Sequence, residues 1–224
     1  MTLKKTILGL TLAVIGFSGL SQAQAKSPYP YSLKNYDKPS KGCYPVSRVS
    51  LTEARDIIRL QKLKLVGAGP IETRTLGAAL TWMHYLNGDE PLRSATWKRR
   101  DPYQIRIVSG NGSSGQRWDH ILIRRNGHKQ HGESVAQHVH ELAHLIGNNG
   151  SYQLYRNHMK GYGYCLVSGY SDNRFNEQFA EVFTAFVTEP ALLTKNSSTP
   201  KACKRAFDFF ESWFDAGNRV QECL

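Results

Sequence analysis

Two histidines four residues apart, in the sequence His-Glu-Leu-Ala-His at residues 140–144, constrain this chain more than any other feature. In a helix this spacing puts both imidazole rings on one face, one turn apart, where two ring nitrogens can bind one metal ion. The stretch therefore requires a helix here and further ligands from other parts of the chain. His138 lies two residues before His140, about 200° around the helix, so we expect it to be structural or at the surface.

Glu141 follows the first of these histidines directly, which completes the H-E-x-x-H pattern of zinc metalloproteases. In that pattern the two histidines, here His140 and His144, hold Zn²⁺. The glutamate takes a proton from the attacking water and passes it to the leaving amine. Ser134 and Gln137 fit a capping box at the start of the helix. The pattern predicts one zinc ion and Glu141 as the catalytic base.

The third protein ligand has to come from further along the chain. The longer pattern H-E-x-x-H-x-x-G-x-x-H holds as far as Gly147, which we also expect to end the helix. Gly150 then stands where the last histidine would be. This argues against a metzincin site and favours a carboxylate from a later helix as the third ligand.

Two glutamates four residues apart, Glu177 and Glu181, lie on one face of a helix predicted for residues 174–188. One can complete the zinc site, and the other can accept the outer N–H of a ligand histidine. Periodicity alone favours a solvent-exposed face for both, but a two-histidine site needs a third ligand. The downstream alternatives to these glutamates are His158 and Asp172.

The apolar periodicity elsewhere predicts both helices and strands. We expect helices from Thr52 to about Leu65, from Arg74 to Leu86 and from Thr199 to near Gly217, and strands at Tyr103–Val108 and His120–Arg124. Residues 109–115 read as a loop, and residues 148–172 read as a long irregular connection rich in Gly, Tyr and Asn.

The N-terminus has the pattern of a secretory signal peptide at residues 1–25: two lysines, a 14-residue apolar run and the small residues Ala-Gln-Ala. A retained membrane anchor is the alternative. No later run reaches the ~20 apolar residues of a transmembrane helix. We expect an exported protein, periplasmic or extracellular, with an extended arm at residues 26–50 and one domain at residues 51–224.

Basic residues exceed acidic ones after removal of the signal peptide, 27 against 18, which leaves a net charge of +9. Such a charge favours anionic surfaces, including nucleic acid and envelope polymers, although a solvated surface without such a partner is the first expectation. The basic residues are scattered, apart from the run Lys98-Arg99-Arg100, and no nucleic-acid motif accompanies them. An anionic envelope surface is thus a candidate partner, and a specific nucleic-acid partner is not expected.

The four cysteines contain no C-x-x-C pair, so an even count in an exported chain predicts two disulfides. Three pairings are open. The cysteines are Cys43, Cys165, Cys203 and Cys223. Cys203 and Cys223 are the closest pair in sequence, although the C-terminal tail would have to run back along most of a helix to join them.

The segment Glu177-Gln-Phe-Ala-Glu-Val-Phe183, with Tyr170 seven residues before it, and the His140–His144 stretch together resemble the gluzincin peptidases. More narrowly, they are similar to the group of the anthrax lethal factor catalytic domain and the clostridial Pro-Pro endopeptidases. The resemblance covers about 45 residues of the chain. The interval from His144 to Glu177 is shorter than in that group, and the four cysteines are unlike the clostridial enzymes, so prolyl specificity is not inferred.

The resemblance implies a role for each matching residue. Glu177 would be the third zinc ligand, and Glu181 would hydrogen-bond a ligand histidine. Tyr170 would donate a hydrogen bond to the developing oxyanion. The alternative is that Tyr170, one of eleven tyrosines in the chain, is an ordinary residue of a tyrosine-rich loop.

We therefore expect a single zincin-like α+β domain with a small mixed sheet, an active-site helix and a helical C-terminal part. The strand His120–Arg124 would be the sheet edge that pairs with an extended substrate. The expected function is a secreted zinc-dependent endopeptidase acting on a protein or peptide. The alternatives are an exported hydrolase of cell-wall peptide crosslinks and a secreted binding protein without catalysis on the same fold.

Overall fold

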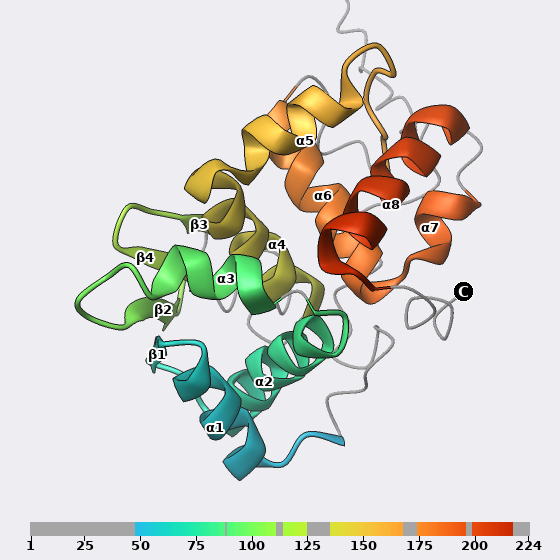
Figure 1. Ribbon diagram of the computed structural model, residues 1–224. Coiled ribbons are helices and arrows are strands. Elements are labelled where there is room, and N and C mark those ends of the chain that lie inside the picture. Colours follow the sequence, from blue (N-terminus) through green and yellow to red (C-terminus); the bar gives the residue numbers. More distant parts are fainter. Residues whose placement is uncertain are drawn as a thin grey trace, which may run out of the picture.

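The protein is described by a computed structural model, drawn in Figure 1. It covers residues 48–87, 89–110, 114–124, 135–167, 174–195 and 199–216. The expected signal peptide, nearly all of the expected arm, and the residues Cys43, Ser134, Tyr170, Asp172 and Cys223 lie outside these ranges.

Helix α1 (Leu51–Leu60) begins at a capping box. The Ser50 hydroxyl accepts a hydrogen bond from the Glu53 N–H at 3.2 Å, and the Glu53 carboxylate accepts one from the Ser50 N–H at 2.8 Å. The cap is therefore Ser50, and the expected start at Thr52 is two residues late. The pairing satisfies two N–H groups that a helix start otherwise leaves without a partner.

The first helix ends earlier than its apolar spacing predicts, because residues 63–66 form strand β1 (Leu63–Val66). Lys62 has a left-handed backbone with φ of 53°, which turns the chain out of the helix. Leu63 is buried and Leu65 partly buried, while the residues after each of them are exposed, which is the alternation of a strand. Over so short a segment the spacing of the apolar residues fits a helix and a strand equally well. The alternating burial shows that the segment is a strand.

Helix α2 (Pro70–Tyr85) starts four residues before the expected Arg74. Pro70 occupies the first turn, where a missing N–H is tolerated, and Glu72 accepts a hydrogen bond from the Gly69 N–H at 2.8 Å. The Gly-Pro sequence therefore opens this helix. A short helix that was not expected, α3 (Asp89–Thr96), follows.

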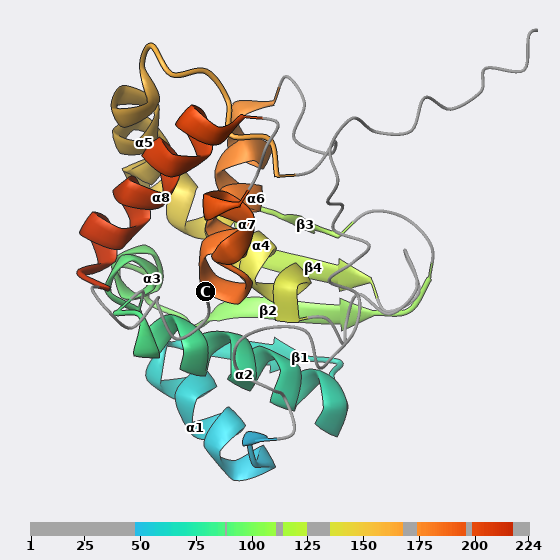
Figure 2. The same cartoon turned by 90° about the vertical axis from the view of Figure 1, so that its right-hand side faces the viewer.

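The sheet has four strands in the order β1-β2-β4-β3, visible from bottom to top in Figure 2. Strands β2 (Tyr103–Val108) and β4 (His120–Arg124) have the expected bounds. Strand β2 pairs in parallel with β1 and β4, and β3 (Gly115–Gln116) pairs antiparallel with β4. The expectation of a small mixed sheet is confirmed, but β4 is an inner strand and β3 forms the edge.

Helix α4 (Val135–Ile146) lies between the sheet and the C-terminal helices and contacts β3, β4, α2, α3 and α6 (Figure 1). The chain does not become irregular after it. A π-helical turn, η4 (Gly147–Ser151), leads directly into α5 (Tyr152–Met159). The change of direction falls at Gly150, whose φ of 107° suits glycine. The α-helix ends before Gly147, as expected, but the chain continues in helical turns to Met159, so much of the expected loop is wrong.

The C-terminal part consists of α6 (Phe175–Thr188), α7 (Ala191–Thr194) and α8 (Pro200–Phe214). Aromatic rings fill the space between these helices and α5. The fully buried rings of this cluster are those of Tyr155, Phe179, Phe183, Phe186, Phe210 and Phe214. Burial of each such side chain contributes roughly 1.5–3 kcal/mol, so this cluster fixes α6 and with it one wall of the site described below.

These elements make one α+β domain, which confirms the expected fold class. Among the described residues, no helix is both long and apolar enough to cross a membrane.

A disulfide joins Cys165, in the segment before α6, to Cys203 in the first turns of α8. Their Cα atoms are 4.4 Å apart, and the bridge closes a loop across 38 residues. The pairing of Cys203 with Cys223, favoured by proximity in sequence, is therefore wrong. Packing of α5 and α6 on α8 brings Cys165 to the start of that helix, whereas Cys223 comes after the end of the helix in the sequence. A disulfide fits an oxidising compartment.

Non-reducing digestion and mass spectrometry will recover a peptide pair that links Cys165 to Cys203. Replacing both residues by alanine will lower the free energy of unfolding by about 2–4 kcal/mol, because the unfolded chain regains the freedom of the open loop. Denaturant titration measures this loss. A linked pair of Cys203 and Cys223 peptides would contradict the assignment.

Candidate metal centre

Three side chains from two helices bring one potential ligand atom each to the same point. His140 and His144 come from α4, and Glu177 comes from the first turn of α6. The Nε2 atoms of the two histidines are 3.1 Å apart, and Glu177 Oε2 is 3.3 Å from His140 Nε2 and 3.4 Å from His144 Nε2. Of the three expected ligands, all three therefore meet, and this group can hold a metal ion.

The spacing of these atoms tests whether the group fits a metal. In a tetrahedral site with bonds of 2.0–2.1 Å, neighbouring ligand atoms are separated by about 3.3 Å. The three measured separations of 3.1–3.4 Å agree with this value. Two imidazoles and one carboxylate are also the donor set of one class of catalytic zinc site, which leaves a fourth position open.

Packing of α4 against α6 explains why the ligands meet. Val139, Leu142 and Ile146 bury one face of α4, and Phe179 and Phe183 bury one face of α6. The ligands occupy the remaining faces. Nearly all of α4 is buried, including His140 and His144, so the helix cannot rotate without exposing apolar surface.

Carboxylates stand at both ring nitrogens of His140. Glu177 faces Nε2, and Glu181 Oε1 lies 3.2 Å from Nδ1. Burial by itself would lower the pKa of His140, but the two carboxylates outweigh it and raise the pKa to about 10. Burial would likewise raise the pKa of Glu177, yet contacts with His140 and His144 hold it well below its usual range. A cation at Nε2 has to displace the proton that this arrangement favours.

Glu141 is buried beside the ligands, and one of its two carboxylate oxygens accepts a hydrogen bond. Its Oε1 accepts a hydrogen bond from Gln137 Nε2 at 2.7 Å, and its Oε2 is buried without a hydrogen-bond partner among the described residues. Burial raises the pKa of Glu141, and the positive charges of His140 and His144 oppose that rise. An oxygen atom in this position can accept a proton from a molecule bound in the cleft.

Tyr152 is a residue of the site that the sequence did not indicate. Its hydroxyl lies 2.7 Å from His144 Nδ1. With Nε2 turned towards a metal, Nδ1 carries the proton, and this N–H donates a hydrogen bond to the Tyr152 oxygen. Burial raises the pKa of Tyr152, so the group stays a neutral phenol.

Gly147 makes this contact possible. A Cβ atom at position 147 would lie 2.1 Å from Cε1 of the Tyr152 ring, so any side chain there would displace the tyrosine. The glycine that follows the last residue of α4 thus also admits an aromatic ring. Finding Tyr152 from sequence would have required recognising that α5 continues from α4 through residues 147–151, which read as a loop.

The ligands and Glu141 line a cleft of about 310 Å³. Strand β3 forms one wall through Gly115 and Gln116, and Arg117 lies at its end. The Gln116 side chain accepts a hydrogen bond from Asn148 Nδ2 at 2.8 Å and donates one to the Tyr103 hydroxyl at 3.1 Å. The edge strand beside the cleft is therefore β3 and not the expected His120–Arg124, whose two edges are both paired.

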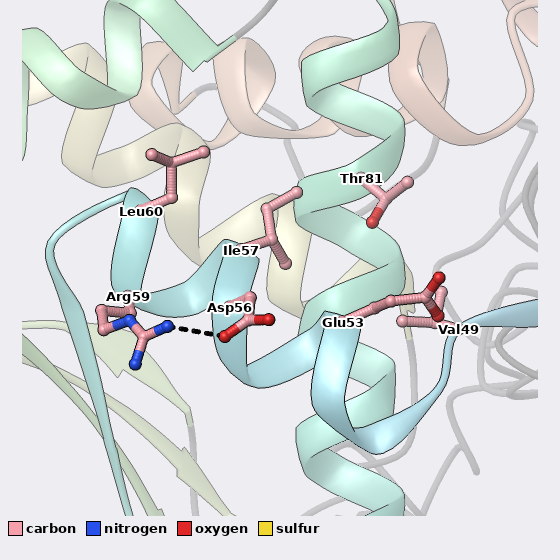
Figure 3. A pocket seen from close by; sticks show the side chains of 7 residues that line it. All are labelled: Val49, Glu53, Asp56, Ile57, Arg59, Leu60 and Thr81. Carbon is pink, nitrogen blue, oxygen red and sulfur yellow. Dashed lines mark hydrogen bonds and ion pairs between the residues drawn. The ribbon is translucent and has the colours of Figure 1, made fainter.

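A larger hollow, of about 670 Å³, lies between α1 and α2 (Figure 3). Its acidic side chains are Glu53 and Asp56, and Asp56 is paired with Arg59 at 2.7 Å. The only group of three metal-binding side chains among the described residues is the one in the smaller cleft. The candidate site is therefore identified by the metal-binding side chains of the smaller cleft and not by the size of the hollow.

The remaining residues considered from sequence are distributed as follows. His138 was expected to be either structural or at the surface. It is buried on α4, so the structural role remains. His158 lies 3.0 Å from the Arg205 carbonyl oxygen, at α8, and is not part of the ligand group. Tyr170 and Asp172 are outside the described residues.

Comparison with known proteins adds no relative: no family model, no curated protein and no solved structure matches the chain. The interpretation of the site therefore depends on its own geometry.

Replacing Tyr152 by phenylalanine will weaken zinc binding about 10- to 100-fold, because the ring stays in place while His144 loses the acceptor that orients it. Competition with a chromophoric chelator measures the affinity. Tyr155→Phe is the matched control, since that buried hydroxyl accepts a hydrogen bond from Gln178 and does not belong to the ligand group. Equal zinc affinity in both variants would contradict a role for the Tyr152 hydroxyl.

Proposed function

We propose that the protein is an exported zinc-dependent endopeptidase. The observation that carries this proposal is the ligand triangle of His140, His144 and Glu177 with the buried Glu141 beside it, in a cleft bordered by a strand edge. A zinc site used only for structure typically has four protein ligands, whereas this group supplies three. A bound metal would then have a position left for water or substrate, which suits a catalytic site.

When bound, Zn²⁺ would supply Lewis acidity, lowering the pKa of a water molecule and polarising the carbonyl of the scissile bond. Glu141 would take the proton of the attacking water on its unpartnered oxygen and pass it to the leaving amine. A carboxyl with a raised pKa suits this role, since it holds a proton more readily than a solvated glutamate does. Gln137 would keep the carboxylate turned towards the cleft.

Two residues would position the ligands. Glu181 supports His140 and Tyr152 supports His144, each at the ring nitrogen opposite the metal position. Tyr170 keeps the role implied by the resemblance to the gluzincins, that of a hydrogen-bond donor to the developing oxyanion.

The substrate would lie along β3. Within the described residues this strand pairs only with β4, so its outer edge can bind the main chain of an extended peptide. A peptide held there would pass the ligands and Glu141 within the same cleft. The cell-wall crosslink hydrolase and the non-catalytic binding protein are competing functions that the following experiment separates.

Glu141→Gln will abolish hydrolysis while zinc content stays at one ion per chain, because the amide keeps the shape of the side chain but cannot accept the proton. Glu177→Ala will lose the ion itself. Elemental analysis gives the metal content, and digestion of a diverse peptide pool and of purified peptidoglycan, with and without chelator, gives the activity. Undiminished cleavage by Glu141→Gln would exclude the mechanism, and cleavage of peptidoglycan alone would select the cell-wall hydrolase.

Tyr170→Phe will lower kcat by about 100-fold or more with unchanged zinc content, as expected for loss of one oxyanion donor. Rates on a peptide identified from the pool provide the measurement. Tyr164→Phe is a suitable comparison, because it removes another hydroxyl from the same tyrosine-rich segment. A wild-type rate for Tyr170→Phe would assign it to the loop without a catalytic role.

A further inference from the structure

An exposed tryptophan follows the end of β3 and lies beside an arginine, and a second exposed tryptophan follows α3. Trp118 is 87% exposed and Trp97 is 55% exposed, values that are uncommon for the largest apolar side chain. The guanidinium of Arg99 lies over the rings of both Tyr103 on β2 and Trp118. We call Arg99, Arg117 and Trp118, together with Trp97 two residues before Arg99 in the chain, the arginine–tryptophan corner.

Arg99 is held in place and not free in solvent. Its guanidinium donates a hydrogen bond to the Trp118 carbonyl oxygen at 2.9 Å and lies 4.7 Å from the ring centre of Tyr103. It is also 5.8 Å from the ring centre of Trp118. A charge fixed in this way loses little conformational freedom when it binds an anion, which favours binding.

Arg117 connects the corner to the metal cleft, whose wall it helps to form. A Cβ atom at position 115 would come within 2.8 Å of Arg117 Nη1, so the guanidinium lies over Gly115 on β3. Trp118 is the next residue along the chain. A peptide paired with β3 would therefore reach Arg117 first and the tryptophan surface immediately afterwards.

The corner has an excess of positive charge. Residues 97–101 and 116–120 contain four lysines and arginines against two aspartates. One of these aspartates, Asp119, already contacts His120 at 2.7 Å and Arg106 at 3.9 Å. Within the described part of the chain, neither Arg99 nor Arg117 forms an ion pair with a carboxylate, so both can accept an external anion.

We propose that the arginine–tryptophan corner is a subsite for an acidic segment of the peptide substrate, on the side of the scissile bond that extends past Arg117. This rests on the proposed peptidase function. Aspartate or glutamate side chains would pair with Arg117 and Arg99, while an apolar side chain between them would pack on the ring of Trp118. The continuity of the corner with an unpaired strand edge favours a peptide over other polyanions, because main-chain pairing suits only a polypeptide.

Binding to zinc-loaded Glu141→Gln tests the subsite without requiring turnover. The probes are fluorescent peptides of one central sequence with three Glu, Gln or Lys residues on one flank or the other, measured by anisotropy at low and high salt. We expect the Glu peptide of one flank to bind roughly tenfold more tightly than its Gln counterpart at low salt, with a smaller ratio at high salt. Equal affinity for Glu and Gln peptides on both flanks would overturn the proposal.

Substitutions in the same background locate the effect. Arg99→Gln and Arg117→Gln will each reduce the Glu-over-Gln ratio by about threefold or more. Lys64→Gln is the control, because Lys64 is an exposed cation on β1, at the opposite edge of the sheet. If Arg99→Gln unfolds, the exposed Arg117 still decides the matter. A ratio that survives both substitutions would contradict the assignment.

Cleavage of the same peptides by the unmodified protein separates this proposal from the proposed function. Glu-dependent binding without cleavage would retain the acidic subsite and refute the peptidase. Cleavage at equal kcat/KM for Glu, Gln and Lys peptides, with equal binding, would retain the peptidase and refute the subsite. An RNA oligonucleotide that binds through Arg99 and Arg117 while Glu peptides do not bind would also refute it.

Discussion

The packing of α4 against α6 is the interaction on which the site depends. Both helices are buried, and their apolar side chains face the core. Their remaining faces carry two histidines and three glutamates, which lie between the helices or at the cleft. Burying ionisable groups costs several kcal/mol for each uncompensated charge. Burial of the aromatic cluster between α5, α6 and α8 offsets this cost, so these rings hold the ligand group together although none of them belongs to it.

The two histidines are supported differently, and the difference has a chemical consequence. His140 has a carboxylate at each ring nitrogen, which favours positive charge on the ring and explains its raised pKa. His144 has a neutral phenol at Nδ1. Glu177 and Glu181 together therefore bring two negative charges to the ligand group, which balance one divalent cation. The same charges favour a proton on His140 when no cation is bound.

The sequence predicts those parts of the site whose geometry is local. Histidines at 140 and 144 and glutamates at 177 and 181 face one way because a helix has a fixed pitch, and a metal site explains why two such pairs would meet. Tyr152 and β3 could not be predicted in this way. Tyr152 reaches His144 through a π-helical turn, and β3 has only two residues, too few for any period. The Cys165–Cys203 bridge depends on how α5, α6 and α8 pack, which no spacing along the chain reveals.

The turn at residues 147–151 explains how strand and helix keep their relative positions. At its start Gly147 admits the Tyr152 ring that orients His144, and at the next residue Asn148 binds Gln116 on β3. Asn149 then donates a hydrogen bond to Ser94 on α3 at 3.1 Å. One short segment therefore fixes a ligand histidine, the strand edge and a neighbouring helix together. If β3 binds substrate, a shift of the strand would pass through Asn148 to the turn that positions His144, which couples peptide binding to the geometry of the metal centre.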